Sequence, residues 1–405
     1  MKKFNKVLSV VVASAMVMAM AGCGNTDNGS AATGTNAATE SAAASDSAAS
    51  GSVFKIGGIG PTTGGAAVYG LAVQHGAEIA VEEINAAGGI NGYQVEFKFQ
   101  DDEADAEKSV NAYNALKDWG AQIIDGSTTS GACIAVTDKT KEDNMFQITP
   151  SGSAVECVQY DNNFRVCFSD PNQGLASAQY IGENGLAEKI AVIYDSSDVY
   201  SSGIYEKFVK EAENQPFEIV AAEAFTADNK TDFSVQLQKA KDAGADMVFL
   251  PIYYQESALI LTQAAAMGYA PKWFSCDGMD GILGGVDNFD VSLTEGVMLL
   301  TPFAADATDD LTQSFVTKYK EKYGETPNQF AADSYDAIYV IKAAIEKSGV
   351  TPDMSVSDIC DAMKAAMTEI TVDGLTGNGM TWTEDGEANK APKAVVIENG
   401  AYKAM

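Results

Sequence analysis

The fold is decided by residues 53–100, which read VFKIGGIGPTTGGAAVYGLAVQHGAEIAVEEINAAGGINGYQVEFKFQ. Its first residues, Val53 to Ile59, predict a β-strand. Apolar residues then recur at helical spacing from Tyr69 to Asn85, and Gly88-Gly89 follows as a stop signal for that helix. Val95 to Gln100 predicts a second strand. A strand, a helix and a strand in this order predict two parallel strands joined by a crossover helix.

The same alternation continues along the chain, pauses near Pro171 to Gln173, and then starts again. It predicts two α/β lobes of similar design, each a doubly wound parallel sheet. In such sheets ligands bind beyond the carboxyl ends of the strands, so two lobes that face each other would enclose a ligand between them. Further strands are expected at 122–125, 145–149, 189–194, 217–224, 247–250 and 272–276, and helices at 104–119, 134–144, 174–184, 201–215, 233–243 and 257–267.

The N-terminal residues carry the pattern of an export signal. Lys2 and Lys3 precede an apolar run of 14 residues, from Val7 to Met20, which is shorter than the roughly 20 residues that span a bilayer. The segment Met20 to Cys23 resembles the bacterial lipobox, with methionine where leucine is usual. We expect residues 1–22 to be a lipoprotein signal peptide and Cys23 to carry lipid; the alternative is an ordinary secreted protein in which Cys23 is incidental.

A low-complexity segment follows the signal. Asn25 to Ser52 holds no Leu, Ile, Val or aromatic residue, so it cannot bury enough apolar surface to offset its ordering entropy. Residues 23–52 are therefore expected to form a disordered tether to the membrane. The remaining residues, about 350, exceed what one hydrophobic core usually serves, which again favours two lobes.

Composition excludes several classes of partner and cofactor. The formal charge is −30 and the only arginine is Arg165, so nucleic-acid binding is not expected. The six cysteines show no CxxC and no Cys/His spacing suited to zinc. Cys157 and Cys167 are close enough in sequence to form a disulfide, although buried free thiols fit equally well. No metal and no cofactor are implied.

Four expected strand-to-helix loops are rich in Ser, Thr and Gly. Each places hydroxyls or free backbone N–H groups where a helix begins, an arrangement that favours anions such as carboxylates. Each loop taken singly is also explained by ordinary helix N-capping. The four loops are GPTTGGAAVY (60–69), GSTTS (126–130), TPSGS (149–153) and DSSDVY (195–200).

These motifs, together with GAEIAVEEINAAGGINGYQVEFKFQDDEADAEKSV, FLPIYYQES and NQFAADSYDAIY, resemble the branched-chain amino acid binding proteins of ABC transporters. The resemblance covers 53–405. It implies the type I periplasmic binding protein fold, a flytrap whose lobes are joined by three crossovers near Asp170, Thr301 and Ala391. The first lobe would comprise 53–170 plus 301–390, and the second 171–300 plus 391–405.

The resemblance also implies a binding site for a zwitterion. Ser130 and Ser153 fall where the family binds the ligand α-carboxylate, beside the backbone of Ser151 and Gly152. Asp277 falls where the family pairs an acid with the α-ammonium, although many members carry the longer glutamate. The aromatic positions around the ligand match Tyr69, Tyr200, Tyr253 and Phe330.

Simpler roles are available for the same residues. The serines would then be helix caps and the aromatic side chains core residues, with Asp277 a solvated turn residue before Gly278. The ligand class stays open within the fold, because relatives that bind amides, urea or aromatic acids share it.

Three rival functions fit the sequence poorly. The glycines from Gly58 to Gly64 are spaced GxGxxxG, unlike the GxGxxG of dinucleotide-binding enzymes. The single histidine, His75, has no nucleophile motif nearby, which disfavours acid/base catalysis. The acidic run from Gln100 has Ala106 and Ala112 where a calcium loop needs glycine and glutamate.

The sequence therefore predicts a non-enzymatic, extracytoplasmic solute-binding protein that captures a small amino acid. We expect it to be lipid-anchored to the bacterial cell membrane, to be monomeric, and to deliver its ligand to an ABC permease. A ligand-binding sensor for a membrane receptor would share the site and the tether, so it remains the alternative.

Overall fold

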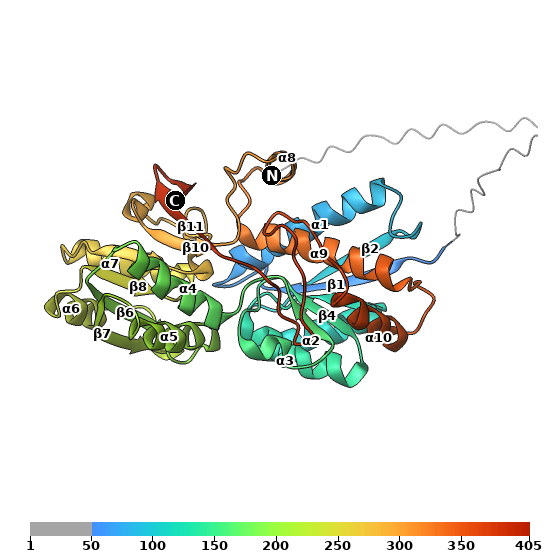
Figure 1. Ribbon diagram of the computed structural model, residues 1–405, viewed down its shortest axis with the longest axis horizontal. Helices are drawn as coiled ribbons and strands as arrows, with labels where there is room; N and C mark the ends of the chain where they lie inside the picture. Colours follow the sequence, from blue (N-terminus) through green and yellow to red (C-terminus); the bar gives the residue numbers. More distant parts are fainter. Residues whose placement is uncertain (1–50) are drawn as a thin grey trace, which may run out of the picture. The chain divides into compact units, whose positions relative to one another are not determined.

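The structure is a computed structural model that describes residues 51–405. The predicted signal peptide, Cys23 and nearly all of the predicted tether lie outside the described residues. The described residues form two β-sheets with helices packed on them (Figure 1). We name each sheet with its helices a lobe, the first lobe being the one that contains the strand following Val53.

The first lobe is built on a parallel sheet of five strands in the order β2-β1-β3-β4-β5. Its strands are β1 (Phe54–Gly60), β2 (Val95–Asp101), β3 (Ile123–Asp125), β4 (Phe146–Thr149) and β5 (Asn163–Arg165). Its helices are α1 (Ala67–Ala86), α2 (Ala106–Trp119), α3 (Ser130–Asp143), the short η1 (Val155–Val158), α8 (Asp310–Tyr323), α9 (Gln329–Ser348) and α10 (Val356–Met367).

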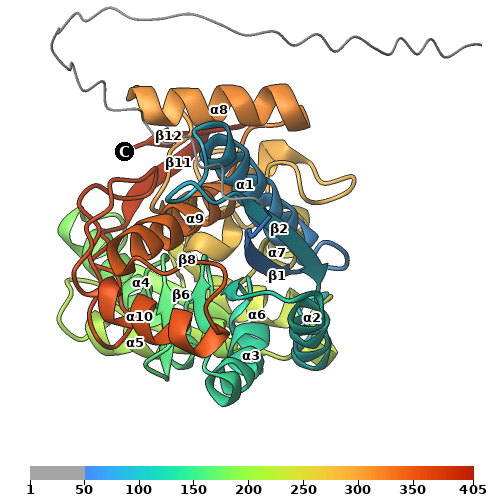
Figure 2. The same cartoon turned by 90° about the vertical axis from the view of Figure 1, so that its right-hand side faces the viewer.

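Helices cover both faces of this sheet because neighbouring strand residues point to opposite sides. Ile123 joins the core formed with α1 and α9, while Ile124 joins the core formed with α2 and α3. Figure 2 shows α1 and α9 side by side, although they are far apart in sequence. Gly76 allows this close packing, since a Cβ there would lie 2.0 Å from the Ala331 carbonyl oxygen.

The second lobe is built on a sheet of seven strands in the order β12-β11-β10-β9-β8-β6-β7. Its strands are β6 (Lys189–Asp195), β7 (Glu218–Phe225), β8 (Met247–Leu250), β9 (Lys272–Ser275), β10 (Met298–Thr301), β11 (Lys393–Glu398) and β12 (Ala401–Ala404). Its helices are α4 (Asp170–Glu183), α5 (Val199–Ala212), η2 (Ala227–Asn229), α6 (Ser234–Asp242), α7 (Tyr254–Ala266), η3 (Asp277–Met279) and η4 (Val291–Thr294).

The predicted α/β class with two parallel-sheet lobes is confirmed, with two differences in detail. β11 and β12 pair antiparallel at the edge of the second sheet, so this sheet is mixed. β5 was not expected as a strand, because three residues that follow a turn carry no alternating pattern. The last three helices return to the first lobe before the chain ends in β11 and β12 of the second lobe.

Two further features bear on the predictions. Within residues 51–405, no helix combines the length and apolar character that crossing a membrane requires. The five cysteines of this range are buried free thiols, so Cys157 and Cys167 form no disulfide.

Candidate functional site

Two loops of the first lobe, one after β3 and one after β4, are fastened to each other by hydrogen bonds. The Ser130 hydroxyl oxygen accepts from the backbone N–H groups of Ser153 and Ala154, each at 3.2 Å. The Ser151 hydroxyl donates to the Thr128 carbonyl oxygen at 2.6 Å. Both loops follow parallel strands, so they lie at the carboxyl ends of β3 and β4, where α3 begins. The simpler alternative for Ser130, a cap of its own helix, is therefore not what the geometry shows.

Two hydroxyls on these loops have no hydrogen-bond partner within the described residues. They belong to Thr129 and Ser153, which are 6% and 1% exposed. An unsatisfied buried polar group costs roughly 1–3 kcal/mol, so such groups in native proteins demand an explanation. Hydroxyls placed beside a helix N-terminus are suited to donate to an anion that arrives from outside.

Arg165 on β5 fixes the shape of the second of these loops. Its guanidinium donates to the carbonyl oxygens of Gly152 (3.2 Å), Ser153 (2.5 Å) and Ala154 (2.9 Å). The side chain is fully buried, and its Nε lies 3.3 Å from the Glu387 carboxylate. Because Arg165 binds the carbonyl oxygens of the loop and Ser130 and Thr149 accept its N–H groups, the Ser153 hydroxyl is the group of this loop left without a bond.

The second lobe contributes a hydrogen-bonded group centred on Asp277, which begins η3. One carboxylate oxygen accepts from the Tyr200 hydroxyl at 2.8 Å, and the other from Gln173 Nε2 at 3.0 Å. The Tyr200 hydroxyl also accepts from the Gly278 N–H at 2.9 Å, a contact that any Cβ on Gly278 would obstruct. Asp277 is 5% exposed, so it is not a solvated turn residue. Burial raises its pKa to about 7.

Aromatic side chains from both lobes meet between these two groups. The Tyr69 ring of α1 lies 4.3 Å from the Phe330 ring and 5.5 Å from the Tyr253 ring, measured between centroids. Tyr253 in turn stacks on Tyr200 at 5.0 Å. The Tyr69 hydroxyl donates to the Gly278 carbonyl oxygen and accepts from the Tyr254 N–H at 3.2 Å, so it joins the two lobes.

A small cavity lies where the loops and the aromatic rings meet. Its volume is about 10 Å³, room for one water molecule at most. The arrangement is therefore closed to a solute of amino-acid size. The cavity is lined by Tyr69, Thr128, Thr129, Ser130, Ser151, Ser153, Tyr200, Tyr253 and Phe330.

A larger cavity of about 600 Å³ adjoins the small one and shares Thr129 and Tyr253 with it. Residues of both lobes line it, among them Glu103 on one side and Asp198 on the other. Burial raises the pKa of Asp198 to about 6. The larger cavity therefore adjoins the small one at Thr129 and Tyr253.

Most of the site residues predicted from the sequence line the small cavity, but Gly152 and Asp277 do not. Gly152 is in the loop but turned away, with its N–H donating to Thr149 Oγ1 at 2.7 Å. Asp277 is bonded to Tyr200, which lines the small cavity, but does not line the cavity itself. The sequence analysis missed Thr128 and Thr129 as lining residues, although both stand inside the GSTTS motif, and it gave Arg165 no role. Within residues 51–405, no group of three or more His, Cys, Asp or Glu side chains is placed to hold a metal ion.

Comparison with known proteins places this geometry in a family. The family model described as periplasmic binding protein matches residues 53–401. The chain belongs to the periplasmic binding protein family. Among curated relatives of this binding protein, the leucine-, isoleucine-, valine-, threonine- and alanine-binding protein of Pseudomonas aeruginosa is 30% identical over 302 residues, which cover 73% of this chain and 78% of the relative.

Solved structures of similar binding proteins share the fold. The branched-chain amino acid transporter substrate binding protein LivJ from Streptococcus pneumoniae, in complex with isoleucine, has a TM-score of 0.78 and 28% identity, covering 87% of this chain and 98% of that one. The leucine binding protein LivK from Thermotoga maritima has a TM-score of 0.77, with the same identity and coverage. Periplasmic binding proteins work outside the cytoplasm, so this chain is an extracytoplasmic solute-binding protein.

Proposed function

We propose that this protein captures a small amino acid, preferably leucine, isoleucine or valine, between its lobes and delivers it to an ABC permease. The observation that carries the proposal is the pair of unpartnered buried hydroxyls, Thr129 and Ser153, at one end of a cavity walled by aromatic rings. Such a site supplies donors for a carboxylate and apolar surface for an aliphatic side chain. The ligands named for its relatives have both groups.

In this proposal the first lobe binds the α-carboxylate. The hydroxyls of Ser130 and Ser153, with the backbone of Ser151, surround it, and Thr129 adds a donor, whereas the Gly152 N–H is already bonded to Thr149. Arg165 keeps the loop in place from behind. Hydrogen bonds to a charged group contribute roughly 1.5–3 kcal/mol each, so about three of them with apolar burial reach micromolar affinity.

The second lobe then binds the α-ammonium and covers the side chain. Asp277 supplies the negative charge and Tyr200 a hydroxyl oxygen, while Tyr69, Tyr253 and Phe330 pack on the aliphatic part. Because the Asp277 oxygens are already bonded to Tyr200 and Gln173, the ammonium has to share or displace these donors. The short aspartate side chain reaches the ammonium only when Tyr200 moves or when a water molecule bridges the gap.

Opening of the lobes is part of the mechanism. A cavity of about 10 Å³ admits no amino acid, so the ligand enters a separated form and the lobes close over it. The ligand shifts the population towards the closed form by binding that form more tightly. The closed form is then what the permease recognises.

The remaining parts of the proposal concern location and partners. We infer lipid attachment at Cys23, with residues 23–52 as a tether and a single copy of the chain as the working unit. The lobes would divide at the residue boundaries expected from the sequence. No catalytic step and no cofactor enter the proposal. Mass spectrometry of the N-terminal peptide tests the anchor, since Cys23→Ala should abolish the lipid mass.

Isothermal calorimetry of the purified protein, unfolded and refolded to strip carried ligand, tests the function. The titrants are leucine, isoleucine, valine, an aromatic amino acid and an aliphatic amide. We expect micromolar or tighter binding of at least one aliphatic amino acid, and binding weakened 10-fold or more by Ser130→Ala and by Asp277→Asn. Heat from the amide alone would contradict the amino-acid proposal, and unchanged affinity in both variants would contradict the residue assignments.

A further inference from the structure

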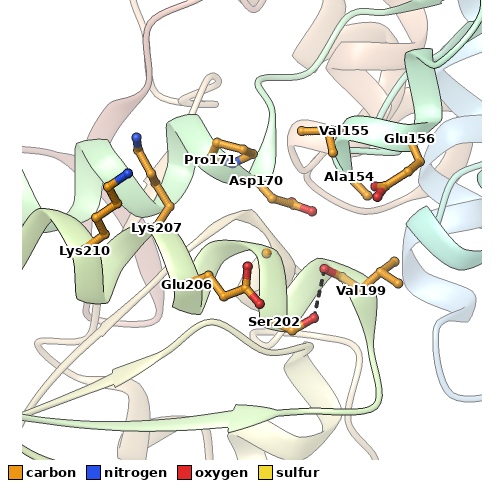
Figure 3. Close-up of a pocket in the computed structure, with 11 residues that line it drawn as sticks. Ala154, Val155, Glu156, Asp170, Pro171, Val199, Ser202, Glu206, Lys207 and Lys210 are labelled. Atoms are coloured by element: carbon orange, nitrogen blue, oxygen red, sulfur yellow. Dashed lines mark hydrogen bonds between the residues drawn. The ribbon is translucent and has the colours of Figure 1, made fainter.

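A third cavity lies beside the loop that carries Ser153, next to Ala154 and Val155. Its volume is about 420 Å³. Ala154, Val155 and Glu156 of the first lobe form one wall, and the N-terminus of α4 with one side of α5 forms the other (Figure 3). We name it the Asp170 cavity after the carboxylate that extends into it. Because both lobes line this cavity, a molecule bound there would touch both.

Asp170 is a buried carboxylate without a partner. Its side chain is 1% exposed, and neither carboxylate oxygen makes a hydrogen bond of normal geometry within residues 51–405, although the neighbouring Ser153 hydroxyl acts to lower its pKa. α5 approaches it closely at Gly203, where an added Cβ would lie 3.3 Å from Asp170 Oδ2. Figure 3 shows the carboxylate extending into the space between Ala154 and Val199.

The nearby cations do not neutralise this carboxylate. The Arg165 guanidinium is engaged with three carbonyl oxygens and lies beside Glu387. In Figure 3 Lys207 and Lys210 lie at the opposite end of the cavity from the Asp170 carboxylate. An ionised carboxylate buried without a partner is strongly destabilising, so it takes up either a proton or a cation. Burial raises the pKa of Asp170 well above its ordinary value.

The composition of the cavity decides which cation fits. A metal ion is disfavoured, because no cluster of three or more ligating side chains occurs among the described residues. Ala154, Val155, Pro171 and Val199 give the cavity an apolar side, while Glu156, Ser202 and Glu206 make the rest of the lining polar or acidic. A buried carboxylate beside an apolar wall, with further acids nearby, suits a cation that carries N–H donors on an alkyl chain.

We propose that the Asp170 cavity is a second binding site, which takes a primary alkylammonium. The ammonium donates to both oxygens of Asp170, and the alkyl chain lies along Val155 and Val199. Glu206, on the same cavity wall, adds negative charge. Since the ligand contacts both lobes, it favours the closed arrangement and is coupled to the cleft through the Ser153 loop.

The alkylammonium has two sources, a free amine and a second molecule of amino acid. An amino acid brings a carboxylate as well, and Lys207 and Lys210 at the outer end of the cavity are placed to receive it. The site is separate from the proposed amino-acid cleft, and the proposal stands whether or not that cleft binds leucine.

Calorimetry with n-butylammonium chloride tests the proposal on the purified protein. We expect saturable binding of one equivalent, weakened 10-fold or more by Asp170→Asn and unchanged in Glu213→Gln, an exposed carboxylate just after the end of α5 that does not line the cavity. Tetramethylammonium, which has no N–H donors, is expected not to bind. Titration with leucine separates the two sources. If the wild-type protein binds two leucine molecules and D170N binds one, the natural ligand of the Asp170 cavity is a second amino acid. If both proteins bind one leucine, the natural ligand is a free amine.

Two further variants keep the test decisive. Val155→Trp fills the apolar part of the cavity from an exposed position without touching Asp170, and it should also weaken butylammonium binding 10-fold or more. Asp277→Asn removes the acid of the cleft. Wild-type affinity in both D170N and V155W, no saturable binding to the wild-type protein, or a loss of binding in D277N alone would overturn the proposal.

Discussion

The two halves of the candidate cleft are built in opposite ways. On the first lobe, Arg165 holds a loop rigidly and leaves two hydroxyls, those of Thr129 and Ser153, without partners. On the second lobe, Asp277 and Tyr200 satisfy each other's hydrogen bonds. The first half is therefore ready to bind an anion, whereas the second half has to exchange one set of hydrogen bonds for another.

This difference implies an order of events. A ligand gains most by docking on the first lobe, since the unpartnered hydroxyls acquire partners there. Closure of the second lobe adds a smaller net gain, because the bonds of Asp277 are already made. Single substitutions in each half can test the contrast between a fixed half and an exchangeable half.

Arg165→Met should have the largest effect, on stability. The substitution leaves three loop carbonyl oxygens and the Glu387 carboxylate without their cation, so the free energy of unfolding is expected to fall by about 3–5 kcal/mol. Urea unfolding measures it. Lys364→Met is the control, because its ion pairs with Asp161 and Asp361 are at the surface and contribute less than about 1 kcal/mol. Equal losses in the two variants would show that Arg165 does not hold the loop.

Ser153→Ala should affect binding but not stability. Its hydroxyl makes no bond within the described protein, so its removal leaves the unfolding free energy nearly unchanged and weakens amino-acid binding roughly 10- to 100-fold. Ser130→Ala is the matched comparison, because its hydroxyl oxygen accepts two backbone N–H groups and its loss should lower stability as well. A destabilised Ser153→Ala protein would mean that the hydroxyl is a structural group.

The exchangeable half should respond to pH. The folded protein raises the pKa of Asp277 from 3.8 to about 7, so between these values the folded state holds a proton that the unfolded state has lost. Stability therefore falls as the pH rises from about 4 to 7, and part of this slope should disappear in Asp277→Asn. Amino-acid affinity should rise from pH 6 to 8 as the carboxylate ionises, and calorimetry should find a flatter profile in the variant. Identical profiles would remove Asp277 from the site.

Tyr69→Phe should have the smallest effect. It removes the hydroxyl that joins α1 to Gly278 and Tyr254 while keeping the ring. At about 0.5–1.5 kcal/mol for a neutral hydrogen bond, affinity should fall roughly 2- to 10-fold, and small-angle scattering should show a larger share of open molecules. Tyr339→Phe loses a hydroxyl bond to Glu83 within the first lobe and should change neither quantity. The same change in both variants would rule out a role for Tyr69 in closure.

Local patterns in the sequence sufficed for the α/β class and for most of the cavity lining. The GSTTS and TPSGS motifs each follow a buried strand, and parallel strands bring such loops to one edge. The short strand β5 was not predicted. The role of Arg165 was missed for the same reason, because its contacts depend on where β5 pairs with β4. The bond between Asp277 and Gln173 spans 104 positions, so no local pattern reports it.

The antiparallel pair at the edge of the second sheet has a consequence for biogenesis. β10 pairs with β11, which is made more than ninety residues later, and α1 of the first lobe packs on α9 from the last quarter of the chain. Neither lobe can complete its core until nearly the whole polypeptide has been synthesised. Long-range pairing of this kind slows folding. A chain of this topology therefore keeps both cores incomplete for most of its synthesis.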